Sequence, residues 1–450
     1  MSIASVQRTQ SKPVDSGPSD DGFTVLVAGA GIGGLEAILA LRQIAGSGLR
    51  IEMLSPEGVY RLAPLSVLEP FTETTPTEVS LAAFCDDHSV ELSLDGLAEV
   101  WPEQQRVLTD SGSELYYDAL ILSMGARRQP VSPGAFSFRG SADVDGMVQR
   151  LRWVGHSGGR IAFVVPREVD WTLPLYELAL MTADQLRSGP VTIEFLTSEP
   201  RPLAAFGESA SGLAAELLAA ADVRVRAGLS DPLASAGELE ADELISLPVL
   251  SVPEIAGVPQ HRAGFVPVDP EMRVPGAQSV WAVGDVTWSP LKQGGLAAQQ
   301  ADVAAASIAA AAGYEVEVPP YAPVLRAALM TADGPYYLRS GTPDSDGELR
   351  APLWWPPAKV AGRLLAPYLA QRMGAAADDR ELVDLPVTKR RAEDHQEACD
   401  LALRWADVDA ASGDFKRALH WLDVAEGLDL TLPAIYERRR EQWRRSVNSG

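Results

Sequence analysis

Six residues near the start of the chain have the spacing of a phosphate-binding loop. Gly29-Ala30-Gly31-Ile32-Gly33-Gly34 matches the pattern GxGxxG at Gly29, Gly31 and Gly34. In such a loop the first glycine makes a tight turn, and the second lets a pyrophosphate approach the backbone. The third lets the next helix lie close to the strand, with its dipole directed at the phosphates. The pattern predicts nucleotide binding, although a glycine-rich turn alone occurs in many α/β proteins.

A strand, a helix and a second strand must hold this loop, and the flanking sequence supplies all three. Residues 23–28 form an apolar, β-branched run that is typical of a buried parallel strand. An apolar helical stretch follows at 35–44, and residues 50–54 form the second strand. The acid that binds the ribose normally follows that strand, which makes Ser55 and Glu57 the candidates.

Two later segments repeat the arrangement of a strand that ends in a turn of small residues. Residues 117–122 form a strand before Ser123-Met124-Gly125, and residues 280–283 form one before Gly284-Asp285. An Ala-rich stretch at 291–312 follows and is predicted to be helical. A turn after a strand is common, but the order of the three motifs is specific.

These motifs resemble those of the flavoproteins with two dinucleotide-binding domains, which include the pyridine nucleotide-disulfide reductases. Gly33-Gly34-Leu35-Glu36-Ala37, Arg61-Leu62-Ala63-Pro64 and Lys292-Gln293-Gly294-Gly295-Leu296-Ala297 are most similar to segments of sulfide:quinone oxidoreductases and type II NADH dehydrogenases. The resemblance extends over about residues 23–338 and implies FAD as the cofactor. Because no cysteine is identified near the flavin, non-covalent binding is expected. The resemblance implies that Asp285 hydrogen-bonds the ribitol-phosphate side of FAD, and that Lys292 and the helix after it lie near the flavin ring.

The expected cofactor-binding residues come from the glycine loop, the ribose position and the family motifs. They are Gly29, Gly31, Ile32, Gly33, Gly34, Ser55, Glu57, Pro64, Val100, Ser123, Met124, Gly125, Gly284, Asp285, Lys292, Gln293, Gly294 and Gly295. A surface role for Lys292 and a plain loop role for Pro64 are the alternatives.

The resemblance also implies a second unit, which binds NAD(P)H in related enzymes. Residues 160–165, 175–185 and 191–196 form its strand, helix and strand. We therefore expect an inserted Rossmann-like unit that interrupts the first one.

The glycine loop of this second unit is degenerate. Counting back from Glu177 places Asp170, Thr172 and Leu175 where three glycines are expected. Side chains at these positions would block the approach of a pyrophosphate, and Asp170 would repel it. We expect the unit to keep its fold but to lack ordinary NAD(P)H binding.

Composition narrows the functional classes further. The chain has 61 acidic and 38 basic residues, for a net charge of −23, which disfavours nucleic acid and anionic membranes as partners. Cys85 and Cys399 fall in no paired motif, which argues against a disulfide scaffold, a metal site and the persulfide chemistry of sulfide oxidation. The histidines fall in no catalytic pattern, so no catalytic residue is assigned. We expect a cytoplasmic protein without a transmembrane segment.

The expected fold is α/β, with two Rossmann-like units, the first interrupted by the second, and a helical C-terminal region. The expected division is a disordered N-terminus at 1–21, an FAD-binding domain at 22–145 and 263–345, a degenerate NAD(P)-type domain at 146–262, a Trp/Pro-rich segment with an apolar helix at 346–392, and a helical appendage at 393–450. Residues 358–373 are the predicted apolar helix. We expect Trp354-Trp355 to pack on the flavin domain or in a dimer rather than on a membrane.

Two functions remain open from the sequence. The first is an FAD-dependent oxidoreductase that passes electrons from an unidentified donor to a quinone or protein acceptor. The second is a catalytically weak flavin-binding interaction protein, which docks a partner through 393–450, where residues 413–418 resemble part of a tetratricopeptide repeat. The intact Lys292–Gly295 segment favours the first function. The second is favoured because the chain lacks both routes by which related enzymes take up electrons, the glycine loop for NAD(P)H and the cysteines beside the flavin.

Overall fold

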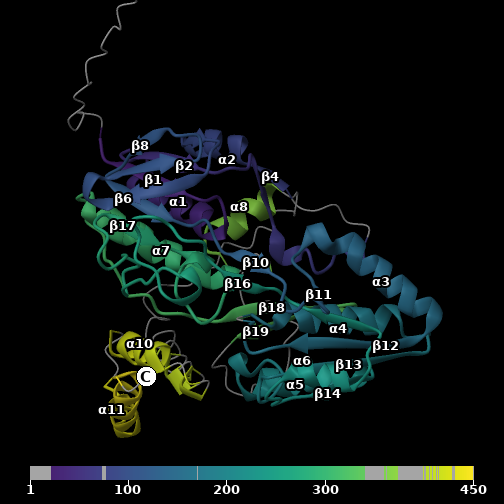
Figure 1. Ribbon diagram of the computed structural model, residues 1–450. Helices are drawn as coiled ribbons and strands as arrows, with labels where there is room; N and C mark the ends of the chain where they lie inside the picture. The colour runs from purple at the N-terminus through teal and green to yellow at the C-terminus, as the bar shows by residue number, and fades with distance from the viewer. Residues whose placement is uncertain are drawn as a thin grey trace, which may run out of the picture.

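Two five-stranded parallel sheets organise the chain (Figure 1). The computed structural model describes residues 22–72, 78–169, 171–339, 359–360 and 362–372, together with 399–448 except 400–401, 405, 408, 412, 414 and 428–430. The first sheet has the order β17-β9-β1-β2-β5, with β1 Thr24–Ala28, β2 Arg50–Leu54, β5 Glu91–Ser93, β9 Ala119–Leu122 and β17 Val280–Ala282. The second has the order β11-β15-β12-β13-β14, with β11 Phe136–Ser137, β12 Gly159–Val165, β13 Val191–Thr197, β14 Val223–Arg226 and β15 Glu243–Ser246.

Smaller antiparallel sheets and helices complete the fold. The antiparallel strands are β3 Val59–Arg61 with β4 Glu78–Ser80; β6 Leu97–Trp101, β7 Arg106–Thr109 and β8 Glu114–Tyr116; β10 Arg127–Gln129 with β16 Val249–Ser251; and β18 Arg326–Thr331 with β19 Gly334–Arg339. The helices are α1 Ile32–Ala45, α2 Leu81–His88, α3 Val144–Ser157, α4 Leu173–Gln185, α5 Glu208–Ala220, α6 Pro232–Glu238, α7 Gly294–Ala311, α8 Leu365–Arg372, α10 Phe415–Gly427 and α11 Ala434–Asn448.

The first sheet is built as the sequence predicts. Residues 25–28 of β1 are buried between β2 and β9, with Val27 paired to Met53 on one side and Ile121 on the other. The apolar residues of α1 are buried, and α1 packs along α7. Because β17 lies at the end of this sheet beside β9, residues far apart in the sequence complete one unit.

The second sheet begins earlier in the chain than the sequence indicates. β11 pairs in parallel with β15, with Phe136 opposite Ile245, although the expected boundary lay after residue 145. The Phe138 N–H donates to the Ser246 carbonyl at 2.8 Å and extends this pairing. The segment is short and lies among Pro, Ser and Gly residues, so it has no strand-like pattern and only the tertiary pairing makes it a strand.

Helix α8 begins later than predicted. The expected helix covered 358–373, but Lys359 and Val360 lie in a bend and the helix starts at Leu365. The cause is Glu36 of α1, whose carboxylate accepts the N–H groups of Leu364 at 2.8 Å and Leu365 at 2.7 Å. These donors belong to the start of the helix, where the backbone has no partner of its own.

The buried Glu36 carboxyl gives the protein a specific pH dependence. Burial, together with the charge of Asp302, raises the pKa of Glu36 from its ordinary 4.5 to about 7. The Glu36 carboxyl therefore binds its proton more tightly in the folded state than in the unfolded state. Its contribution to the free energy of unfolding is therefore fully present below pH 4.5 and is lost as the pH rises to about 7.

We expect the Glu36→Gln variant to lose this contribution to the slope of stability against pH. Urea unfolding of both proteins across this interval measures the difference, which has an upper limit of about 1.4 kcal/mol per pH unit. The exposed Glu216 on α5 gives the control, Glu216→Gln, which should keep the wild-type slope. Equal slopes for wild type and Glu36→Gln would contradict the role of this carboxyl.

The C-terminal helices pack on the rest of the chain. Ala418 and Ala425 of α10 are buried, and α10 packs against α11. Trp421 of α10 lines a small pocket together with Val268 and Tyr321 of the first unit. Residues 1–21 and Trp354-Trp355 lie outside the described residues. Within the described ranges, no helix is both long and apolar enough to cross a membrane.

Candidate functional site

One cavity of about 260 Å³ lies where the carboxyl ends of the two parallel sheets meet. The first sheet contributes Gly31 after β1, Gly125 after β9 and Asp285 after β17. The second contributes Val169 after β12 and Leu247 after β15. Ligands of open parallel sheets bind outside the carboxyl ends of the strands, so this is the expected place for a site.

The glycine loop after β1 can exist only with glycines at its ends. A Cβ on Gly29 would lie 2.5 Å from the Ser123 backbone, and Gly29 has a φ of +108°. A Cβ on Gly34 would lie 2.1 Å from the Gly29 carbonyl oxygen. At Gly31, by contrast, the nearest atom to a Cβ would be the Ser123 oxygen at 3.7 Å. Gly31 is therefore the glycine that leaves room for a ligand.

The start of helix α1 faces the cavity without a side-chain cap. Gly31 is its N-cap residue, and Gly31, Ile32 and Gly33 all line the cavity. The first N–H groups of a helix have no partner within it and bind anions well, since the helix dipole adds positive potential there. This end of the cavity suits a phosphate.

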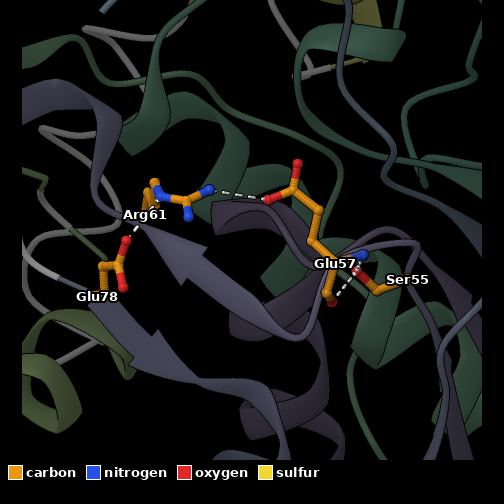
Figure 2. Close-up of polar contacts among 4 residues, drawn as sticks. All are labelled: Ser55, Glu57, Arg61 and Glu78. Atoms are coloured by element: carbon orange, nitrogen blue, oxygen red, sulfur yellow. Dashed lines mark hydrogen bonds and ion pairs between the residues drawn. The ribbon is translucent and has the colours of Figure 1, made fainter. Parts of the chain in front are cut away.

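The expected ribose position lies in the turn after β2. The Ser55 hydroxyl donates to the Glu57 carbonyl at 3.0 Å and accepts the Glu57 N–H at 3.3 Å. Figure 2 shows that Arg61 lies between Glu57 and Glu78, with ion-pair distances of 3.2 Å and 2.8 Å. The Ser55 hydroxyl is thus used by its own turn, the Glu57 side chain is exposed, and neither residue lines the cavity.

The turn after β9 supports the glycine loop. The Ser123 hydroxyl lies 3.0 Å from the Ala28 carbonyl oxygen and 2.7 Å from that of Gly29, and it donates to them. Gly125 lines the cavity with a φ of +71°, and Met124 is exposed beside it. Val100, by contrast, does not line the cavity. Its side chain is fully buried in the core.

Asp285 is the single acid in the cavity wall among the described residues. Its carboxylate accepts no hydrogen bond from any described residue, while the neighbouring Gly284 N–H is bound by Gln300 at 2.7 Å. Burial raises the pKa of Asp285, and the charges of Lys292 and Arg128 oppose that rise. An acceptor held in this way is suited to a hydroxyl donor on a ligand.

The side chains of the segment before α7 make contacts within the protein that its sequence does not indicate. The buried Lys292 ammonium donates to the Thr287 carbonyl and lies 3.7 Å from the centre of the Phe265 ring. The Gln293 side chain caps α7 by accepting the Leu296 N–H at 2.8 Å. Lys292, Gln293 and Gly294 line the cavity together with Pro64, whereas Gly295 does not line it.

Lys359 is a cavity residue that the sequence did not indicate. Its side chain is 7% exposed and its ammonium lies 2.5 Å from a carboxylate oxygen of Glu177, which is fully buried on α4. Glu177 also accepts the Met330 N–H at 2.9 Å. Burial lowers the pKa of Lys359, and its pairing with Glu177 opposes this change. In the sequence, only Glu177 could have pointed to Lys359, since a buried carboxylate requires a cation or hydrogen-bond donors as partners.

The described residues at the start of α4 in the second unit carry side chains where a nucleotide loop would have glycines. Asp170 lies outside the described residues, but Thr172 is the N-cap of α4 and Leu175 is fully buried in its first turn. Three hydroxyls surround the Glu199 carboxylate, which follows β13: those of Tyr176 at 2.6 Å, Thr197 at 3.1 Å and Thr172 at 3.2 Å. These hydrogen bonds connect the start of this helix to the turn after β13.

Solved structures share this architecture. The sulfide:quinone oxidoreductase of Aquifex aeolicus matches with a TM-score of 0.62 and 19% identity, over 72% of this chain and 86% of that one. A ferredoxin reductase of Rhodopseudomonas palustris matches with a TM-score of 0.53 and 19% identity, over 70% and 81% of the two chains. Putidaredoxin reductase, in a covalent complex with putidaredoxin, matches with a TM-score of 0.53 and 19% identity, over 73% and 85%.

No family model matches the sequence, and no curated protein matches it. At this level of identity the structural likeness concerns the fold. It confirms the α/β architecture that the motifs predict, because the chain has the same fold as these three reductases.

Proposed function

We propose that the protein is an FAD-dependent oxidoreductase that transfers electrons from a donor other than NAD(P)H to a quinone or protein acceptor. The observation that carries this proposal is the single cavity at which the uncapped start of α1, Asp285 and the start of α7 converge. The structural neighbours named as a quinone oxidoreductase and as ferredoxin reductases support it.

The residues present fit FAD. Gly31 leaves space for the pyrophosphate, and the first N–H groups of α1 would bind its oxygens. Glu57 would accept a hydroxyl of the adenosine ribose, and Asp285 would accept one near the ribitol phosphate. Bound FAD supplies two-electron redox chemistry, while the chain positions it and sets the charge around it.

The closed second unit supports a donor other than NAD(P)H. Glu199 takes the place after β13 where an acid would bind the ribose, but its carboxylate is bound by Tyr176, Thr172 and Thr197. Entry of a dinucleotide would break these three hydrogen bonds and leave buried polar groups without partners. Thr172 would also crowd the pyrophosphate, because it stands at the position of the second glycine and is the N-cap residue of α4.

Neither cysteine supplies a thiolate to the cavity. Cys85 is buried on α2, where burial and the charge of Asp86 raise the pKa of its thiol to about 11. Cys399 is buried, and neither residue lines the cavity. Electron entry through a persulfide is therefore not part of the proposal.

Anaerobic reduction of the purified protein tests the proposal. We expect a flavin spectrum, no bleaching by millimolar NADH or NADPH, and complete bleaching by dithionite. Rapid bleaching by either nucleotide would contradict the exclusion of NAD(P)H, and protein that fails to bind added FAD would contradict the proposal as a whole.

The second candidate is a flavin-binding interaction protein with little turnover. Two features favour it. Hydrogen-bonded side chains at the start of α4 stand where a reductase would bind NAD(P)H, and the packed C-terminal helices offer a surface for a partner protein. Reoxidation of the dithionite-reduced protein separates the two. Rapid reoxidation by a water-soluble quinone supports the enzyme, and equally slow reoxidation by quinone and oxygen supports the interaction protein.

A further inference from the structure

The turn that carries Asp285 is held in place by a side chain of α7. Gln300 accepts the Gly284 N–H at 2.7 Å, and its amide group donates to the Thr287 hydroxyl at 3.4 Å. The Thr287 hydroxyl donates to the Gly284 carbonyl at 2.7 Å, which closes the turn around Asp285. Gln300 and Thr287 are both buried, so water does not compete for these hydrogen bonds. The two side chains therefore fix the backbone that presents Asp285 to the cavity.

The same network holds the second charged residue of this turn region, Lys292. The Thr287 carbonyl accepts a hydrogen bond from the Lys292 ammonium. Asp285 and Lys292 line the main cavity, whereas Gln300 and Thr287 do not. Gln300 and Thr287 therefore act on this cavity only through the residues that they position.

The C-terminal helices reach Gln300 from a place outside the main cavity. Gln300, Tyr321 and Trp421 of α10 line a second pocket of about 20 Å³, which shares no lining residue with the main cavity. A space of this size holds about one water molecule, so it is a packing junction and not a cofactor site. Trp421 and Tyr321 are 2% and 5% exposed. Trp421 thus limits the space that the Gln300 side chain can enter.

We infer that Trp421 is a positioning residue of the cofactor site, which keeps Gln300 on the Gly284 N–H and thereby fixes Asp285. The inference rests on the proposed function, because Asp285 is there assigned to FAD. It gives α10 a role in cofactor binding although Trp421 does not line the main cavity. The C-terminal helices then complete the cofactor site from behind the turn, in addition to any partner that they bind.

Calorimetric titration of the full-length apoprotein with FAD tests this inference. Gln300→Leu removes the acceptor of the Gly284 N–H and should weaken FAD binding by about tenfold. Trp421→Leu opens space beside Gln300 and should weaken FAD binding by about threefold or more. If Trp421 acts through Gln300, Trp421→Leu should have no further effect in the Gln300→Leu background. The visible circular dichroism of bound FAD should change in the same way in both single variants.

The matched control is Trp443→Leu on α11, since Trp443 is also buried but lines neither pocket. It should lower the stability in urea and leave the FAD affinity unchanged. An unchanged FAD affinity in Trp421→Leu, an equal loss of affinity in Trp443→Leu, or multiplying effects of Trp421→Leu and Gln300→Leu would each overturn the inference. Failure of the wild-type protein to bind FAD would instead overturn the proposed function.

Discussion

Replacing Gly31 by valine is expected to reduce the FAD content of the purified protein by about tenfold or more without unfolding it. Gly31 has a φ of −78° and a ψ of −175°, which valine adopts without strain. The nearest atom to the new Cβ would be 3.7 Å away. Because Gly31 lines the cavity, the valine side chain would occupy the space proposed for the pyrophosphate.

Gly34→Ala is expected to act on the fold instead. Its Cβ would lie 2.1 Å from the Gly29 carbonyl oxygen and 2.6 Å from the Ser123 hydroxyl, and both atoms belong to the supporting turn. Overpacking of this kind costs about 1–3 kcal/mol or more of unfolding free energy.

Urea unfolding and the FAD-to-protein ratio measure the two effects separately. Gly212→Val on α5 is the control, because no atom lies within 4 Å of its Cβ and the position is exposed. It should retain FAD. Full FAD binding by Gly31→Val would show that the pyrophosphate lies elsewhere.

Replacing Glu177 on α4 by leucine is expected to be the more destabilising of the two single substitutions at its buried ion pair with Lys359. It would leave Lys359 buried without its partner and would remove the acceptor of the Met330 N–H. Breaking a buried ion pair from one side costs about 3–5 kcal/mol. Lys359→Met should cost less, because Glu177 can take up a proton and keep the Met330 hydrogen bond.

A double-mutant cycle checks this prediction. Since apolar side chains often replace a buried ion pair at little cost, Glu177→Leu combined with Lys359→Met should be more stable than Glu177→Leu alone. The exposed pair of Arg50 and Glu91 gives the control, and Arg50→Met should cost less than about 1 kcal/mol. Additive effects of the two buried substitutions would show that the ion pair has no coupling energy.

The sequence predicted the parts of the site that local spacing encodes. Gly29, Gly31 and Gly34 form their loop because a strand, a turn and a helix follow one another within a few residues. The sequence also located Asp285 at the cavity wall, since a strand followed by Gly-Asp is a local pattern. The contributions of Ser55, Val100 and Lys292 depend on hydrogen bonds and packing that spacing does not specify.

The remaining features depend on contacts between distant residues. Lys359 reaches the cavity because Glu177, 182 positions earlier, binds its ammonium. Helix α8 begins at Leu365 because Glu36, 329 positions earlier, accepts its N–H. The missing glycines of the second unit are a local pattern, but the position of Glu199 at the start of α4 follows from its three hydroxyl partners, which the sequence does not indicate. No periodicity or motif in one segment carries such information.

The two buried glutamates also fix the order in which the protein can mature during synthesis. Glu36 lies in the first unit and Glu177 in the second, yet their partners are Leu364 and Leu365 for the former, and Met330 and Lys359 for the latter. While the ribosome still holds these residues, each nascent unit contains a buried carboxylate without its partners. The second unit therefore reaches its final stability only after residue 359 has been synthesised, and the first unit only after residue 365. The short segment that contains Lys359 and Leu365 thus links the stability of both units to residues that are synthesised after them.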